Sequence, residues 1–208
     1  AEPSEETQTL YQRIRAQEVM PSSKDLTSPY VGLRAFTSAD ANNFFGRVKI
    51  IQRLHESIQT HSLVAVLGPS GSGKSSVIHA GLFSRLTGRA TPKGQNSAIE
   101  WTLISLRPGD TPFRNLALAL APHVNMQPTA LVTQLKTGAR KLTDLVGEIT
   151  APDPTSASGH PAPERRVLLV IDQFEELFSL CPDPETRQAF LDLILQPSLD
   201  SGREPGIG

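Results

Sequence analysis

Residues 68–75 read GPSGSGKS, a full match to the pattern G-x-x-x-x-G-K-[ST]. A loop with glycine at three of its eight positions can turn its backbone N–H groups inward onto a polyphosphate, because residues without a Cβ reach positive φ and let an anion approach closely. In this pattern Lys74 supplies a positive charge for the outer phosphates, and Ser75 offers its hydroxyl to Mg²⁺. The stretch therefore predicts a site for a nucleotide with Mg²⁺.

The residues on either side of this loop favour the same interpretation. Before it, the apolar run LVAVL at residues 63–67 is suited to a buried parallel strand. After it, the chain from Ser75 to about Leu86 is typical of a helix, with Gly88 as its stop signal. The N-terminus of that helix would add a partial positive charge beside the phosphates.

A second apolar run, VLLVI at residues 167–171, ends in Asp172. A strand that ends in an acid commonly presents a metal-associated carboxylate to the loop serine, so Asp172 is the candidate for the Walker B acid. Glu175 and Glu176 follow at the expected turn into a helix, where one carboxylate can act as general base toward a water. Adjacent residues cannot point the same way, so the other is expected to be a favourable charge in the first helical turn. We favour Glu176 as the base and keep Glu175 as a second candidate.

The order of these elements predicts an α/β fold, a three-layer P-loop NTPase with a parallel sheet of the ASCE type. A further strand is expected over residues 99–106, between the other two in the sequence. This spacing is that of P-loop ATPases that insert an extra strand between the Walker strands. Together with an acid close after Asp172, it favours hydrolysis by water over phosphoryl transfer to a small acceptor.

Four further helices are expected, each with apolar residues at three- and four-residue spacing. Their expected ranges are 48–58, 112–120, 129–149 and 183–197. The buried faces are predicted to include Val48 in the first helix and Leu195 in the last, and Pro197 is predicted to end the last helix. Residues 198–208 are expected to form a loop.

Length and composition limit the domain organisation and the partners. With 208 residues, 38% hydrophobic content and a formal net charge of −1, the chain can bury one sizeable core and has no basic excess to favour nucleic acid or a membrane surface. We expect residues 1–27 to be an N-terminal linker or tail and residues 28–208 to be the N-terminal part of a P-loop NTPase domain. Within it, residues 151–166 are rich in proline and small residues and are expected to form a flexible surface loop.

The cysteine content and the hydropathy pattern bear on the compartment. The single cysteine, Cys181, cannot form an internal disulfide and is expected to be a small packing residue. No apolar run approaches the roughly 20 residues that span a bilayer, and the acidic N-terminus does not resemble a signal peptide. The sequence therefore favours a cytoplasmic location.

Several segments together resemble the STAND class of P-loop ATPases, the signal-transduction ATPases with numerous domains. These segments are SPYVGLRAF at 28–36, DANNFFGR at 40–47, GPSGSGKSSVIHAGL at 68–82, RPGDTPFRNLALAL at 107–120 and VLLVIDQFEELFSL at 167–180. The chain is most similar to the bacterial branch that is often fused to WD-type repeats or to TIR or caspase-like effectors. The resemblance covers about residues 28–196.

The resemblance implies a regulatory switch that is closed with ADP and oligomeric with ATP, with slow Mg²⁺-dependent hydrolysis. It implies sensor and effector domains in the same longer protein, and a role in bacterial signalling or antiphage defence. Phe45, Gly46 and Arg47 match the segment near the adenine and ribose, and Asp172 to Glu176 match the Walker B segment. The residues that match the phosphate loop are Gly68, Pro69, Ser70, Gly71, Ser72, Gly73, Lys74, Ser75 and Ser76. Tyr30 either approaches the base or packs in the core.

The family pattern continues with elements that this sequence lacks, namely a fourth strand with a sensor arginine, a fifth strand and a winged-helix module. In the family's strand order the fourth strand lies between the strand before Gly68 and the strand ending in Asp172. The sheet is therefore expected to be truncated before its fourth strand and to contain a gap, as in a fragment of a longer protein.

Other interpretations of the same residues remain open. GPSGSGKS also opens guanylate-kinase-like enzymes, although about 60 residues precede it here, and transporter ATPases carry a Glu directly after the Walker B acid, where this chain has Gln173. A scaffold that holds a nucleotide without hydrolysing it is the third alternative. Arg107 is either a phosphate or partner contact or a solvated arginine at a strand end. The preference for ATP over GTP is also left open.

Overall fold

Two long parallel strands form the central part of the fold. The structure is a computed structural model, and it describes residues 35–88, 99–152, 163–200 and 206–207. The expected tail at 1–27 and Tyr30 lie outside the described residues, as does most of the expected loop at 151–166. The residues from Arg34 to Gly208 belong to one compact unit. In the parts of the chain that the structure describes, no helix is both long and apolar enough to cross a membrane.

Strand β2 (Ile99–Leu106) pairs with strand β3 (Glu164–Ile171) residue by residue, from Ile99 opposite Glu164 to Leu106 opposite Ile171. The range predicted for β2 is confirmed. Strand β3 begins earlier than predicted, inside the stretch assigned to a loop. An ion pair extends the pairing of the two strands at this end, because Nε of Arg165 on β3 lies 3.0 Å from Oε2 of Glu100 on β2.

Strand β1 (Val64–Ala65) is shorter than the predicted run at 63–67. It pairs in parallel with strand β4 (Gly206–Ile207). The prediction of a loop over 198–208 is therefore wrong at these two residues, and also at 198–200, which lie in a helix. A strand extends only as far as its hydrogen-bonded partner, which here has two residues. Leu67, beyond the paired part, is 74% exposed, and the prediction that the whole run is buried is therefore wrong.

The strand pairs β1–β4 and β2–β3 are separate two-stranded sheets among the described residues. Because β1 and β3 lie in different sheets, the structure agrees with the expected gap between the strand before Gly68 and the strand ending in Asp172. The expected truncation before a fourth strand needs correction, because Gly206–Ile207 forms a short fourth strand beside β1.

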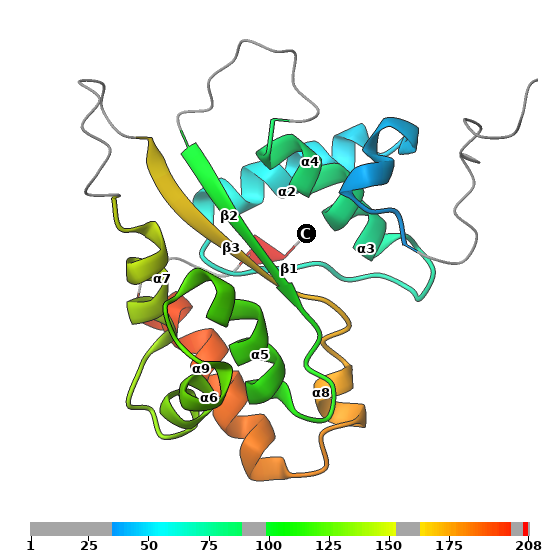
Figure 1. The fold of residues 1–208 in the computed structure, drawn as a ribbon. Coiled ribbons are helices and arrows are strands. Elements are labelled where there is room, and N and C mark those ends of the chain that lie inside the picture. The colour runs from blue at the N-terminus through cyan, green and yellow to red at the C-terminus, as the bar shows by residue number, and fades with distance from the viewer. Residues whose placement is uncertain (1–34, 89–98, 153–162, 201–205, 208) are drawn as a thin grey trace, which may run out of the picture. The chain divides into compact units, whose positions relative to one another are not determined.

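The two faces of the β2–β3 pair pack against different groups of helices. Ile104 and Leu106 belong to one buried cluster, whereas Trp101 and Leu103 contact another. This separation follows from the alternation of side chains along a strand. Figure 1 shows α5, α6, α7 and α9 on one side of the strand pair and α2, α3 and α4 on the other.

Five helices that follow β2 and β3 in the sequence contribute residues to the first cluster. These are α5 (Pro112–Leu120), α6 (Pro128–Lys136), α7 (Leu142–Thr150), α8 (Glu176–Ser179) and α9 (Pro184–Asp200). The short helix η3 (Ala121–His123) follows α5 and has no buried residue. The helical spacing predicts Phe113, Leu116, Ala117 and Leu120 on the buried face of α5, and all four are buried, as is Cys181. The prediction for α5 and the packing role expected for Cys181 are both confirmed.

Three predictions for these helices are wrong. The expected helix at 129–149 is two helices, α6 and α7, because Gly138 adopts φ +67° and breaks the helical path between them. Helix α9 continues past Pro197, since a proline removes one backbone donor but does not always end a helix. Leu195 is 39% exposed and not part of a buried face.

The second cluster lies beside the glycine-rich loop and receives residues from α2 (Val48–Thr60), the π-helix η2 (Val77–Leu82) and α4 (Phe83–Leu86). The short helices η1 (Ser38–Asn43) and α3 (Lys74–Ser76) belong to the same part of the chain. The predicted helix from Ser75 to Leu86 is confirmed, with a π-helical centre, and Gly88 follows it at φ +70°. Val48 is 70% exposed, so its predicted burial is wrong, because it lies at the free first turn of α2.

Candidate nucleotide-binding site

The glycine-rich loop joins β1 to α3 and has the backbone conformation that its glycines allow. Gly71 has φ +74° and Gly73 has φ +90°, and a side chain is strained at such angles. The backbone N–H of Ser72 donates to the carbonyl of Pro69 at 3.2 Å, which makes a turn within the loop. Gly73 directly precedes α3, so the loop ends at a helix N-terminus, as the sequence predicts.

The side chain of Lys74 lies across this loop. Its ammonium donates to the carbonyls of Gly68 at 2.8 Å and Pro69 at 3.0 Å. The charge is therefore held at the concave backbone that a polyphosphate would occupy. Phosphate oxygens are stronger acceptors for an ammonium than neutral carbonyls, so the side chain can exchange one set of partners for the other.

Ser75 and Asp172 meet across the fold. The Ser75 hydroxyl donates to Oδ1 of Asp172 at 2.9 Å, although the two residues are 97 positions apart. Asp172 follows β3 directly, and its backbone N–H donates to the carbonyl of Leu106 at 2.9 Å, so the ladder with β2 continues through it. The sequence predicts the placement of this carboxylate beside the loop serine, and the contact confirms that the two residues are neighbours.

The turn after Asp172 contributes to the orientation of the carboxylate. Gln173 has φ +51°, and it alone among the described residues other than glycine has a positive φ. Its backbone N–H donates to Oδ1 of Asp172 at 3.0 Å. The carboxylate oxygen thus accepts from both sides, which fixes its direction toward Ser75.

The hydroxyl of Ser75 and the carboxylate of Asp172 fit the needs of Mg²⁺. This ion prefers oxygen ligands, keeps several waters, and usually takes one or two protein ligands together with substrate phosphates. Among the described residues there is no group of three or more His, Cys, Asp or Glu side chains that could hold a metal ion. The pair therefore suits a metal that arrives with a nucleotide better than a resident metal.

Glu175 and Glu176 lie where α8 begins. Glu175 is exposed and is the residue before the helix, whereas Glu176 is its first residue and is half-buried. The backbone N–H of Glu176 donates to the carbonyl of Gln173 at 2.9 Å. Their position at a helical turn is as predicted, and the assignment of one of them as general base remains a prediction.

The segment before α2 contacts the glycine-rich loop. The guanidinium of Arg47 donates through Nη2 to the carbonyl of Ser72 at 3.3 Å. Gly46 has φ +83°, which turns the chain between Phe45 and Arg47, and the Phe45 side chain is 80% exposed. The structure therefore brings Arg47 to the loop, and the role of Phe45 and Gly46 at a base or sugar stays a prediction.

A second contact joins the start of this segment to the loop. The backbone N–H of Phe36 donates to Oγ of Ser76 at 3.1 Å, and the Phe36 and Phe44 rings lie 5.5 Å apart. The Ser76 side chain is buried, so its hydroxyl holds the preceding segment rather than a ligand. Among the residues predicted to bind the phosphates, Ser76 therefore uses its side chain for a contact within the protein.

His79 belongs to the same region and was not singled out by the sequence patterns. It lies in η2, four residues after Ser75, and its ring packs edge-on against Phe83 at 5.0 Å. Burial lowers the pKa of His79, while the negative charge of Asp172 raises that pKa and the positive charge of Arg107 lowers it. The helical spacing from Ser75 is the signal that could have found His79, because residues i and i+4 share one helix face.

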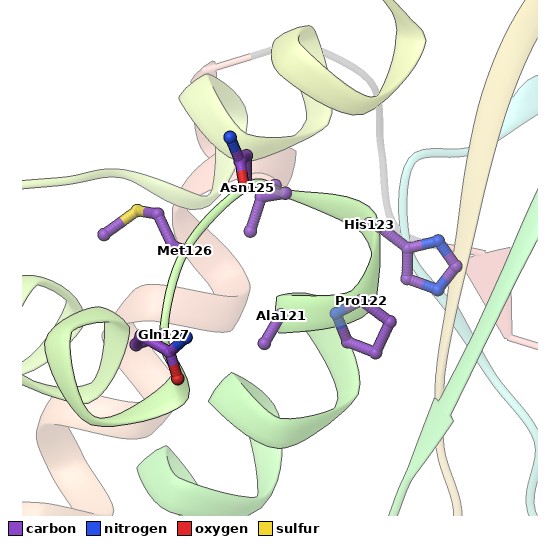
Figure 2. Close-up of a pocket in the computed structure, with 7 residues that line it drawn as sticks. Ala121, Pro122, His123, Asn125, Met126 and Gln127 are labelled. Carbon is purple, nitrogen blue, oxygen red and sulfur yellow. The ribbon is translucent and has the colours of Figure 1, made fainter.

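A hollow at the α5–α6 connection is separate from these residues. It has a volume of ≈ 470 Å³ and is lined by the continuous segment 121–127 (Figure 2). The residues of the glycine-rich loop and of the turn after β3 do not contribute to it. A hollow lined by one short connection offers few converging groups, and it carries no functional argument.

The glycine-rich loop at a helix N-terminus, joined through Ser75 to an acid at a strand end, defines a P-loop nucleotide-binding protein. The sequence pattern of the family described as "Novel STAND NTPase 1" matches residues 29–204. The chain therefore belongs to this family. The STAND resemblance drawn from the sequence is confirmed.

One similar protein is the "Probable sulfate/thiosulfate import ATP-binding protein CysA" of Chlorella vulgaris. It is 36% identical over 84 residues, which are 39% of this chain and 34% of that protein. The chain thus matches about a third of the length of this relative. No solved structure matches the chain.

Proposed function

We propose that the protein binds ATP and ADP with Mg²⁺ at the loop of residues 68–76 and hydrolyses ATP slowly, as a regulatory switch. The observation that carries the proposal is the 2.9 Å contact between the Ser75 hydroxyl and the Asp172 carboxylate. It brings together the two oxygen groups that a nucleotide-bound Mg²⁺ requires from a protein. Membership of the STAND NTPase family supports the same site.

In this proposal each group has a separate task. The loop N–H groups and the Lys74 ammonium bind the phosphates, and Ser75 and Asp172 hold Mg²⁺, which neutralises charge on the phosphates when it is bound. Phe45, Gly46 and Arg47 lie beside the base and sugar. Arg47 already contacts the Ser72 carbonyl, which supports its placement at the nucleotide.

We assign the general base to Glu176, with Glu175 as the second candidate. Glu176 is the less exposed of the two, so it is the one that faces the protein rather than the solvent. Glu175 faces solvent before the first turn of α8, where a negative charge stabilises the helix N-terminus. One residue then serves the reaction and the other serves the helix.

The wider role follows from the family resemblance. We infer an ASCE-type, three-layer domain over residues 28–208, preceded by a linker at 1–27, in a cytoplasmic signalling protein. ATP would favour an oligomeric state that activates an effector domain of the same longer protein, in bacterial signalling or defence. The two separate buried clusters on the faces of the β2–β3 pair support the layered arrangement.

The likeness to an import ATP-binding protein supports nucleotide binding. It does not extend to a transport role. The residue after Asp172 is Gln173, whose backbone adopts φ +51° to bind the Asp172 carboxylate. A glutamate directly after the Walker B acid, as transporter ATPases have, is absent there. The acids of this chain follow three and four residues after Asp172 instead.

Nucleotide titration of the intact protein tests the proposal. Lys74→Ala is expected to weaken ATP and ADP binding by about 100-fold, which corresponds to the loss of two charge-assisted hydrogen bonds. Lys136→Ala is the matched control, because Lys136 is an exposed lysine at the end of α6, in the other cluster. Unchanged affinity in Lys74→Ala would overturn the site, and a parallel titration with GTP measures the base preference.

Hydrolysis distinguishes the switch from a non-hydrolysing scaffold and from a kinase. Phosphate release from ATP by the intact protein is expected to be slow, to require Mg²⁺ and to need no acceptor molecule. Glu176→Gln is expected to abolish release while nucleotide binding persists, whereas Glu175→Gln is expected to retain it. Retained release in both variants would refute the assignment of the base.

A further inference from the structure

Arg107 lies next to Asp172 at the carboxyl edge of the strand pair. Leu106 is opposite Ile171 in the ladder, and the Asp172 N–H donates to the Leu106 carbonyl at 2.9 Å. The next residue of each strand is therefore Arg107 on one side and Asp172 on the other. Adjacent strands are about 4.8 Å apart, so the two residues begin as close neighbours.

The strand alternation places both residues on the face of the glycine-rich loop and its helix. On β2, Trp101 and Leu103 contact the cluster around α2 and η2, and position 107 continues this series with a period of two. On β3, Leu168 contacts the same cluster, and Asp172 continues that series to Ser75. Arg107 is thus directed to the side of the sheet on which the nucleotide loop lies.

His79 lies in η2, one helical turn after Ser75. Burial lowers the pKa of His79, the charge of Asp172 raises that pKa and the charge of Arg107 lowers it. These influences agree with the placement that the strand register and the alternation of side chains give to Arg107 and Asp172.

The loop after Arg107 is held in a fixed conformation. The side chains of Pro108 and Pro112 are fully buried, and the Asn115 amide donates to the Pro108 carbonyl at 2.9 Å. Gly109 has φ +57°, and a Cβ there would approach the Asn115 amide nitrogen to 3.0 Å. This packing fixes the backbone from which Arg107 projects, so a phosphate contact would cost little loop ordering.

The guanidinium itself is free to bind a ligand. The Arg107 side chain is exposed, and within the described ranges it makes no hydrogen bond or ion pair. By contrast, Arg140, Arg165 and Arg166 each pair with a glutamate. A planar guanidinium on a fixed backbone is well suited to bidentate binding of phosphate oxygens.

We propose that Arg107 binds the terminal phosphate of ATP and thereby discriminates ATP from ADP. The inference rests on the proposed function, because it requires a nucleotide at the loop. Lys74 and the loop N–H groups act on both nucleotides, because the α- and β-phosphates are common to ATP and ADP. Arg107 lies at the end of the strand beside Asp172, and in this proposal it contacts the terminal phosphate, which ADP lacks, so its contribution depends on that phosphate.

The test compares binding of the non-hydrolysable β,γ-imido analogue of ATP with binding of ADP, both with Mg²⁺, to the intact protein. Arg107→Ala is expected to weaken the analogue about tenfold or more and to leave ADP unchanged, since one charge-assisted contact is lost. Arg107→Gln, which keeps most of the side-chain length, should give the same selective loss. Arg114→Ala is the matched control, because Arg114 is an exposed arginine on α5 of the same loop–helix segment.

The outcomes separate this proposal from the proposed function. If the wild-type protein binds neither nucleotide, both proposals fail. If the wild-type binds both and the two Arg107 variants bind the analogue as the wild-type does, only the role of Arg107 fails, and the arginine is solvated or a partner contact. Equal weakening of the analogue and ADP would also overturn it, because the effect would then not depend on the terminal phosphate.

Discussion

A Cβ placed on Gly81 would lie 2.5 Å from Cδ1 of Ile51, so helix α2 and the π-helix η2 approach each other as closely as a glycine permits. The nearest atoms belong to the aliphatic side chain of Ile51, which packs against the second cluster. The close approach positions the helix that begins at the nucleotide loop against the segment that carries Arg47. The glycine therefore has a packing role distinct from the conformational role of the loop glycines.

Gly81→Ala is expected to destabilise the protein by about 1–3 kcal/mol, because Ile51 or one of the two helices must shift. Gly147→Ala is the matched control, since Gly147 is also helical and a Cβ there meets nothing within 4 Å. The control should be neutral or stabilising by up to about 1 kcal/mol, as alanine favours a helix. Urea unfolding of both variants measures the difference, and an equal effect of the two would show that the Ile51 contact is not limiting.

Asp172→Asn is expected to remove the Mg²⁺ dependence of nucleotide binding. Asparagine keeps an oxygen that can accept from Ser75, so the fold should be retained, but the negative charge that attracts the metal is lost. Nucleotide affinity measured with Mg²⁺ and with EDTA should differ in the wild-type and coincide in the variant. Asp192→Asn, on the exposed side of α9, should keep the wild-type difference, and a variant at Asp172 that also kept it would exclude this carboxylate as the metal ligand.

The stability of the protein is expected to fall below about pH 6.5 because of two histidines. Burial lowers the pKa of His55 below 6.5, with Arg85 lowering it further and Glu56 raising it. Burial likewise lowers the pKa of His79 below 6.5. Between these lowered values and 6.5, the unfolded chain binds more protons than the folded one, so this stability is present above pH 6.5 and is lost as the pH falls.

Thermal unfolding between pH 5 and pH 8 checks this expectation. His55→Gln and His79→Gln should each flatten the decline, and His123→Gln, at an exposed position in η3, should not. A decline that is as steep in the first two variants as in the wild-type would assign it to other groups.

Local sequence patterns were sufficient where one interaction decides the structure. The apolar run of β2 and the start of α5 at Pro112 follow from local residue types, and the pairing of Ser75 with Asp172 follows from the known order of a phosphate site. Some wrong predictions have a local cause, such as the break at Gly138 in the helix expected over 129–149. Others depend on a distant partner. The short length of β1 is set by its pairing with Gly206–Ile207, and no local property of the run at 63–67 shows this.

The same distinction applies to the candidate site. The loop and the acid after β3 could be found because their residue types are required at fixed spacing. Arg107 has both a solvated and a phosphate-contact interpretation when considered alone, and only the helical spacing from Ser75 could have pointed to His79. The place of Arg107 beside Asp172 arises from the register of β2 on β3, which a single sequence does not encode visibly.

Gln173 has a backbone conformation that is costly for a residue with a side chain. Substitutions at this position are expected to affect stability and Mg²⁺-dependent nucleotide binding in different ways. At φ +51° the left-handed region costs about 1 kcal/mol for such a residue, and this cost is absent for glycine. Gln173→Gly is therefore expected to leave the stability unchanged or raise it by up to about 1 kcal/mol, the gain being offset by the greater freedom of the unfolded chain. Gln173→Val, with a branched Cβ, is expected to destabilise by more than about 1 kcal/mol.

The expected effect of the two variants on nucleotide binding is different. The Gln173 N–H donates to Oδ1 of Asp172 and depends on this conformation, so a glycine that samples other conformations should hold the carboxylate less firmly. Gln173→Gly is thus expected to bind nucleotide with Mg²⁺ more weakly than the wild-type despite equal or higher stability. Urea unfolding and nucleotide titration on the same samples check both parts, and a glycine variant that binds as tightly as the wild-type would show that the turn is not needed to aim Asp172.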